Sequence, residues 1–127
     1  MLKQVDCVML KVEDVDAAIT FYRDVMGLAP LWRAGEMAGL GFPDVIARGE
    51  SMPELVLHSD SRIPQVDVNY KVDDVIAETA RLAEAGCQLL AGPFPIAIGN
   101  CAVILDPFGN SLTLVDMTIG PRQNNLA

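Results

Sequence analysis

Apolar and polar residues alternate near the start of the chain and then change to helical spacing. Val8, Leu10 and Val12 alternate with Cys7, Met9 and Lys11, which is the period of a β-strand with two different faces. The next apolar residues fall on one face of an amphipathic helix: Val15, Ala18, Ile19, Tyr22, Val25 and Met26. Asp14 is placed to cap this helix, and Gly27 suits the left-handed conformation that ends it. We therefore predict a strand that leads directly into a helix.

The same pattern occurs a second time, 60 residues later. Residues 7–17 (CVMLKVEDVDA) and 67–77 (DVNYKVDDVIA) share six identical positions out of eleven. In the second copy the strand runs to Val72, Asp73 or Asp74 caps a helix that reaches Ala85, and Gly86 ends it. A repeat of this kind indicates a repeated structural unit. We expect a single domain over residues 1–120, made of two repeats at about 1–60 and 61–120, with 121–127 as a tail.

Three segments typical of strands follow each predicted helix. They are Leu28–Ala34, Met37–Phe42 and Glu54–Ser59 in the first repeat, and Cys87–Ala91, Ala97–Leu105 and Ser111–Met117 in the second. A longer loop, Pro43–Pro53, separates the last two strands of the first repeat. In the second repeat Asp106-Pro107-Phe108-Gly109-Asn110 has the chemistry of a type I turn and predicts a tight hairpin. Each repeat is thus predicted to be a βαβββ module, and the fold class α+β.

Composition narrows the classes of partner and the compartment. The formal net charge is −8, so the chain lacks the basic surface that binding to nucleic acid requires. We find neither the pattern of an ordinary signal peptide nor a run of about 20 apolar residues, so we expect no membrane partner. The three cysteines lack Cys-x-x-Cys spacing, and reduced thiols in the cytoplasm are their simplest interpretation.

Three features together resemble one known superfamily. They are the repeat, the Phe21-Tyr22 pair late in the first helix, and the Asp106-Pro107-x-Gly109-Asn110 turn. These are similar to the vicinal oxygen chelate superfamily, which includes glyoxalase I, extradiol dioxygenases, fosfomycin-resistance enzymes and bleomycin-resistance proteins. The resemblance covers roughly residues 4–118. It implies a curved, eight-stranded mixed sheet around a cleft, with the helices on the convex face, and a homodimer. It does not fix an activity, because one scaffold can carry many functions.

The resemblance also implies four metal-ligand positions, one on the first and one on the last strand of each module. In the pattern of the superfamily, the first-strand ligand lies seven residues before the capping aspartate, and the last-strand ligand lies between two apolar residues. Here the four positions hold Cys7, Val56 or His58, Asp67 and Thr113. A valine cannot bind a metal, and a threonine hydroxyl is a poor replacement for a carboxylate. We therefore expect the usual metal site to be absent and no cofactor to be bound.

Two other chemistries use the same residues. Cys7, His58 and Asp67 could form a three-ligand site for a divalent metal such as zinc or iron, if His58 rather than Val56 occupies the last-strand position. Alternatively, Cys7 and His58 could serve as a nucleophile and its base. Asp67 near Cys7 would disfavour a thiolate, which counts against the second alternative.

Further residues are expected to line a pocket for a small-molecule ligand. Trp32 could stack on a planar or cationic ligand, although core packing is the more common role of an aromatic residue. Other pocket candidates share strand faces with the four expected ligand positions: Met9, Asn69, Ser111 and Val115. The sequence therefore predicts a metal-independent small-molecule-binding protein of the bleomycin-resistance type, with a cationic or planar ligand. The alternatives are a lyase, isomerase or dioxygenase with a non-standard metal site, and a non-catalytic dimeric scaffold.

Overall fold

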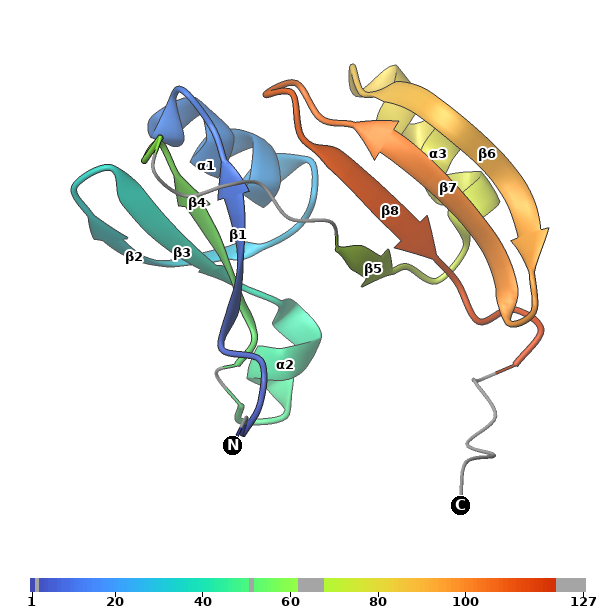
Figure 1. Ribbon diagram of the computed structural model, residues 1–127, viewed down its shortest axis with the longest axis horizontal. Helices are drawn as coiled ribbons and strands as arrows, with labels where there is room; N and C mark the ends of the chain where they lie inside the picture. The colour runs from blue at the N-terminus through green and yellow to red at the C-terminus, as the bar shows by residue number, and fades with distance from the viewer. Residues whose placement is uncertain (2, 51, 62–67, 121–127) are drawn as a thin grey trace. The chain divides into compact units, whose positions relative to one another are not determined.

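The sequence repeat becomes two mixed sheets of four strands, each with a ten-residue helix packed on it (Figure 1). The computed structural model describes residues 1, 3–50, 52–61 and 68–120. The chain divides into two compact units, unit 1 (Met1–Val66) and unit 2 (Asp67–Ala127). The predicted α+β class and the two βαβββ modules are confirmed, and the eight strands form two sheets of four.

Unit 1 contains β1 (Cys7–Lys11), α1 (Val15–Asp24), β2 (Ala29–Ala34), β3 (Met37–Gly41), α2 (Pro43–Ala47) and β4 (Glu54–His58). The strand order is β1-β4-β3-β2, with β1 and β4 parallel and the other pairs antiparallel. Alternate strand residues pack with α1 into a core in which Leu10, Leu40 and Leu57 are at most 1 % exposed. Asp14 caps α1 by accepting from the Ala17 N–H at 3.0 Å, as predicted.

Unit 2 repeats this topology with β5 (Asn69–Lys71), α3 (Val75–Glu84), β6 (Gln88–Ile96), β7 (Gly99–Leu105) and β8 (Ser111–Val115). The order is β5-β8-β7-β6, and only the β5–β8 pair is parallel. Between the two predicted caps, Asp74 is the one used, since its carboxylate accepts from the Ala77 N–H at 3.1 Å. Both predicted stop glycines are left-handed, with φ of 77° at Gly27 and 101° at Gly86.

The hairpin predicted at 106–110 is confirmed and is held by its own aspartate. The Asp106 carboxylate accepts from the Phe108 N–H at 2.9 Å and from the Asn110 N–H at 2.8 Å. The Asn110 side-chain amide donates to the other carboxylate oxygen at 3.1 Å. Asp106 and Asn110 are both buried, so this turn is a closed hydrogen-bonded unit between β7 and β8.

Two predicted segments differ from the structure. Pro43–Pro53 is not wholly a loop, because α2 begins at Pro43; proline suits the first helical turn, where an N–H would have no partner within the helix. The strand predicted at Cys87–Ala91 extends to Ile96 as β6, and the next begins at Gly99 instead of Ala97. Two register shifts let β6 continue past its prolines at the edge of the sheet. Among the residues that the structure describes, none of the helices is both long and apolar enough to cross a membrane.

Candidate functional site

The candidate site in unit 1 lies on the sheet face opposite α1, which we call the distal face. The parallel register sets Cys7 beside Glu54, Met9 beside Val56, and Lys11 beside His58. Paired residues of adjacent strands point to the same side, and the leucines between them point to α1. Among the predicted site residues, Cys7, Met9, Val56 and His58 therefore share the distal face of unit 1.

The predicted residues of unit 2 share the equivalent face, opposite α3. Asn69 pairs with Thr113, and Ser111 and Val115 lie two residues to either side of Thr113 on β8. Asn69 and Ser111 are exposed, Thr113 is half-buried and Val115 is buried. Asp67 lies outside the residues that the structure describes. The predicted site residues that the structure describes thus fall into two groups, one on each distal face.

Strand register decides which residue of β4 is equivalent to Thr113. Met9 and Asn69 are equivalent by the 60-residue repeat, Met9 pairs with Val56, and Asn69 pairs with Thr113. Val56, not His58, therefore occupies the position that corresponds to Thr113. Neither side chain supplies a good metal ligand.

Cys7 and His58 lie at opposite ends of the β1–β4 pair. Cys7 pairs with Glu54, and His58 is four residues further along β4. At about 3.3 Å per residue the two are about 13 Å apart along the strands, whereas ligands of one zinc ion lie about 2.0–2.3 Å from it. These strands therefore do not bring Cys7 and His58 to one ion, nor within the hydrogen-bond distance that a nucleophile and its base require. Among the described residues, no group of three His, Cys, Asp or Glu is placed to hold a metal ion.

His58 is fully buried, and its hydrogen bonding fixes its tautomer. Its Nδ1 accepts from the Asp60 N–H at 3.1 Å, so a neutral ring carries its proton on Nε2. Burial lowers the pKa of His58; the nearby Asp60 opposes this effect and Lys11 adds to it. Its backbone carbonyl also accepts from the Val12 N–H at 2.8 Å, which joins the end of β4 to the segment before α1. His58 is thus neutral near neutral pH, and its hydrogen bonds tie the end of β4 to neighbouring segments.

Cys7 is held in its thiol form. Burial raises its pKa, and the negative charge of Asp6, a hydrogen bond with Asp6 and the charge of Glu54 raise it further. A nucleophilic cysteine requires a lowered pKa, so these surroundings do not favour nucleophilic chemistry.

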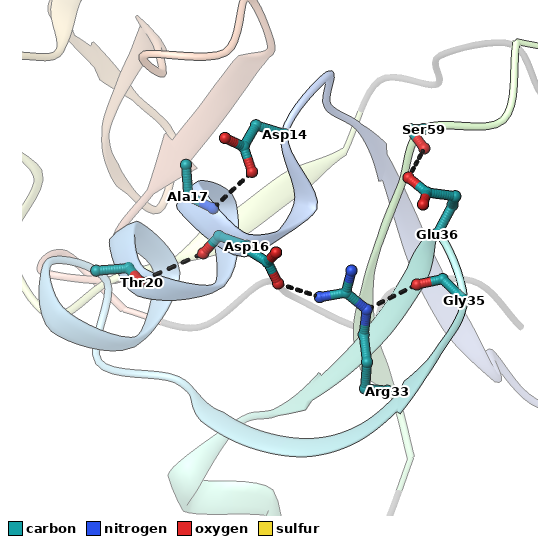
Figure 2. Close-up of polar contacts among 8 residues, drawn as sticks. All are labelled: Asp14, Asp16, Ala17, Thr20, Arg33, Gly35, Glu36 and Ser59. Atoms are coloured by element: carbon teal, nitrogen blue, oxygen red, sulfur yellow. Dashed lines mark hydrogen bonds and ion pairs between the residues drawn. The ribbon is translucent and has the colours of Figure 1, made fainter.

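Trp32 points to the distal face, while its neighbour Arg33 points to the side of α1. Figure 2 shows the Arg33 guanidinium beside Asp16 of α1 at 2.5 Å, with its Nε donating to the Gly35 carbonyl at 2.7 Å. Successive side chains of a strand point to opposite faces, so Trp32 lies over the other side of β2. The same view shows the Ser59 hydroxyl donating to Glu36 at 3.0 Å, which joins the end of β4 to the β2–β3 turn.

The Trp32 indole makes a contact that sequence reasoning missed. Its Nε1–H donates to a carboxylate oxygen of Glu54 at 2.9 Å. It also lies over Gly39, where an added Cβ would meet the indole Nε1 at 2.1 Å. Two signals were available: Glu54 alternates with Val56 in a predicted strand, and a glycine inside a strand often marks the close approach of another group.

The distal face of unit 2 has a different character. The counterpart of the Trp32–Gly39 pair is Ala91 opposite Val103, and Phe94 lies opposite Cys101. Glu54 corresponds to Ser111 by register. Unit 2 therefore presents mainly neutral and apolar residues where unit 1 presents an indole beside a carboxylate.

Comparison with known proteins places this fold in a family. The family described as "Glyoxalase/Bleomycin resistance protein/Dioxygenase superfamily" matches residues 4–114. Among curated protein sequences, no significant match to the chain is found.

Solved structures that share the fold include the following three. The antibiotic-binding protein TnmS3 from Streptomyces sp. CB03234 is 24 % identical with a TM-score of 0.73, and the match covers 92 % of this chain and 98 % of that one. A superfamily member from Sphaerobacter thermophilus DSM 20745 is 18 % identical, with a TM-score of 0.72 and coverage of 91 % and 98 %. The lactoylglutathione lyase from Agrobacterium tumefaciens is 21 % identical, with a TM-score of 0.66 and coverage of 91 % and 94 %. With the family match over most of its length, the chain belongs to the glyoxalase/bleomycin resistance protein/dioxygenase superfamily.

Proposed function

We propose that this chain is a small-molecule-binding protein that works without a metal ion. The observation that carries this proposal is the pair of equivalent positions on the last strands, which hold Val56 and Thr113. The wide separation of Cys7 from His58 supports it, because it removes the most plausible replacement set of ligands.

The nature of the distal faces supports binding of an organic ligand. Small-molecule sites are mostly apolar with a few polar groups that orient the ligand. On the distal face of unit 1, the apolar residues Met9, Val56 and Trp32 lie near the carboxylate of Glu54. On the distal face of unit 2, the apolar residue Val103 lies beside the polar residues Asn69 and Thr113. TnmS3 is an antibiotic-binding protein with this fold, which makes sequestration of a cationic or planar compound a reasonable function for this chain.

A second candidate is an enzyme with an unusual metal site. Cys7 and Glu54 lie side by side on β1 and β4, and thiolate and carboxylate are both zinc ligands. The lactoylglutathione lyase among the similar structures makes lyase chemistry the natural form of this alternative. The raised pKa of Cys7 weighs against it, because a metal binds the thiolate.

Metal analysis and thermal unfolding separate the two candidates. We expect protein purified without chelator to contain far less than one zinc, iron, manganese or nickel ion per chain. Compounds that bind the folded state should raise its melting midpoint, and with planar cationic antibiotics this rise should persist in a chelator. Stoichiometric metal that is lost in the Cys7→Ala and Asp67→Ala variants would overturn the metal-free proposal. If no compound raises the midpoint, the binding function itself is wrong.

We also propose that the protein is a cytoplasmic homodimer, which follows from the family resemblance and the cysteine pattern. Light scattering should give twice the 13.7 kDa chain mass. A mass of one chain at all concentrations would contradict the dimer.

A further inference from the structure

We propose that Trp32, Gly39 and Glu54 form a preassembled site for a flat aromatic cation on the distal face of unit 1. This inference rests on the proposed binding function and adds the chemical class of the ligand and the residue that selects it. The residue that selects the ligand is Glu54, which supplies a negative charge beside the indole.

Two contacts hold the indole of Trp32 in place, one with Gly39 and one with Glu54. The register between β2 and β3 shifts between Pro30 and Trp32, which brings Trp32 opposite Gly39. The indole Nε1, Cε2 and Cζ2 then occupy the space where a side chain at position 39 would lie, at 2.1–2.7 Å from its ideal Cβ. The hydrogen bond to Glu54 at 2.9 Å holds the nitrogen edge of the ring. A ring already held in place loses little conformational freedom when a ligand stacks on it.

The ring remains accessible although it is fixed. Trp32 is 39 % exposed, while Gly39 beneath it is buried and Glu54 is half-buried. The indole therefore packs against Gly39 of β3 and still leaves surface accessible to a ligand. Indole rings are the side chains on which cations and flat aromatic rings stack most favourably.

The charge around the indole is negative. Glu54 lies beside Cys7 at the start of β1, Asp6 precedes Cys7, and Lys11 is at the far end of the same strand. Burial is the largest cause that raises the pKa of the Cys7 thiol, and the charges of Asp6 and Glu54 add to it, so two carboxylates lie near this end of the sheet. The chain as a whole carries −8. A cation gains from both the indole and the carboxylate, whereas an anionic ring would be repelled by Glu54.

These features define a ligand class. The ligand has a fused or single flat ring with a delocalised positive charge, such as an N-alkylated heteroaromatic ring. An N–H group on the ring edge would add a charge-assisted hydrogen bond to Glu54. The distal face of unit 2 lacks this combination, because Ala91 and Ser111 stand where unit 1 has Trp32 and Glu54.

The single tryptophan of the chain makes this site directly observable. Trp32 fluorescence would be titrated with N-methylquinolinium, a permanent cation, and with quinoline at pH 8, which is neutral and similar in shape. Calorimetry would provide the same two dissociation constants without an optical signal. We expect the cation to bind about tenfold more tightly than the neutral ring.

Three variants at the site and one control variant test the role of each residue. Glu54→Gln removes the charge and should reduce the ratio of the two dissociation constants several-fold, leaving only the smaller preference for the cation that the indole provides. Glu84→Gln, a matched change at an exposed position on α3, should leave the ratio unchanged. Gly39→Ala should weaken both ligands by displacing the indole, and Trp32→Phe provides an independent test by calorimetry if Gly39→Ala does not fold.

The outcomes distinguish this inference from the function on which it rests. Equal binding of both rings to the wild type, or a ratio that persists in Glu54→Gln, overturns the role of Glu54 and leaves small-molecule binding intact. Failure of both rings, with another compound raising the melting midpoint, overturns the site but not the function. Failure of every compound overturns both.

Discussion

The two units share one topology but use their distal faces differently. Helix caps at Asp14 and Asp74 and left-handed glycines at Gly27 and Gly86 are the same in both. On the distal faces, a large residue opposite a glycine in unit 1 (Trp32 and Gly39) becomes a small residue opposite a valine in unit 2 (Ala91 and Val103). The two units therefore share the features that determine folding but differ in the residues of their distal faces.

A second difference lies at the end of the last strand, where Ser59 and Asp116 are equivalent. In unit 1 the carboxylate is on the β2–β3 turn, as Glu36, and it accepts from the Ser59 hydroxyl at 3.0 Å. In unit 2 the carboxylate belongs to Asp116 itself, which directly follows β8. Asp116 is fully buried and accepts from the N–H groups of Val75 and Asn100, both at 2.8 Å, and from the Thr118 hydroxyl at 2.9 Å. Unit 2 thus joins α3, β7 and β8 through one buried charge.

The largest expected effect comes from breaking this buried junction. Asp116→Ala leaves the N–H groups of Val75 and Asn100 without their partner and should lower the melting midpoint by about 10 °C or more. Ser59→Ala removes an accessible hydrogen bond and should lower it by about 2 °C or less. Thermal unfolding followed by circular dichroism measures both. Equal effects of the two substitutions would contradict the difference between the units.

The next largest effect on stability tests the pairing of a large residue, Trp32, with a glycine, Gly39, in unit 1. Gly39→Val introduces the residue that unit 2 has at this position and should destabilise the protein by roughly 1–3 kcal/mol, because the new side chain meets the indole. The emission of Trp32 should also shift to longer wavelength as the ring moves into water.

The double variant provides the control for Gly39→Val. Trp32→Ala with Gly39→Val reproduces the Ala91–Val103 arrangement, so its destabilisation should be smaller than the sum of the two single changes. Strict additivity in urea unfolding would show that the indole does not occupy the space above Gly39.

The dependence of stability on pH should have separate origins in the two units. Burial lowers the pKa of His58 below its usual 6.5, so the unfolded chain takes up a proton first, and stability falls as the pH drops below about 6.5. Hydrogen bonds from Val75 and then from Asn100 and Thr118 lower the pKa of Asp116 to about 2, although burial opposes them. The contribution of Asp116 is complete above its usual 3.8 and is lost as the pH falls through about 2.

Substitution at position 58 separates these two origins. His58→Val introduces the residue that unit 2 has at the equivalent position, Val115, and should remove the loss of stability in mild acid while leaving the loss in strong acid. Melting midpoints between pH 7 and 2 provide the test. A wild-type midpoint that does not change between pH 6.5 and 5 would show that His58 is not held neutral by burial.

The smallest expected effect on stability concerns Glu54. Glu54→Ser introduces the residue of unit 2 at the equivalent position, Ser111, and should change the unfolding free energy by under about 1 kcal/mol, because both Trp32 and Glu54 are partly exposed. The denaturant midpoint would shift slightly at constant slope. A loss of several kcal/mol would mean that Glu54 is a folding residue rather than a binding residue.

The parts of the structure that depend on local patterns could be predicted from the sequence. The caps, the stop glycines and the turn at 106–110 are determined by residues within a few positions of one another. The α2 helix was missed because a five-residue helix has too little periodicity to separate it from a loop. The extension of β6 depends on two register shifts that let its proline-containing part follow the edge of the sheet.

The candidate site was only partly predictable for a related reason. Alternation was enough to place Met9, Val56 and Thr113 on the correct faces. The contact between Trp32 and Glu54 joins residues 22 positions apart and depends on the register shift that places Trp32 opposite Gly39. No local pattern specifies such a shift, so Glu54 could be placed on a face but not beside the indole.

The most direct test of the account is ligand binding to protein freed of metal. Protein dialysed against a strong chelator and checked by elemental analysis would be titrated with N-methylquinolinium, following Trp32 fluorescence and the heat of binding. We predict the same dissociation constant before and after chelation, with metal far below one ion per chain in both samples. Binding that disappears on chelation and returns when stoichiometric zinc or iron is added would contradict the central claim.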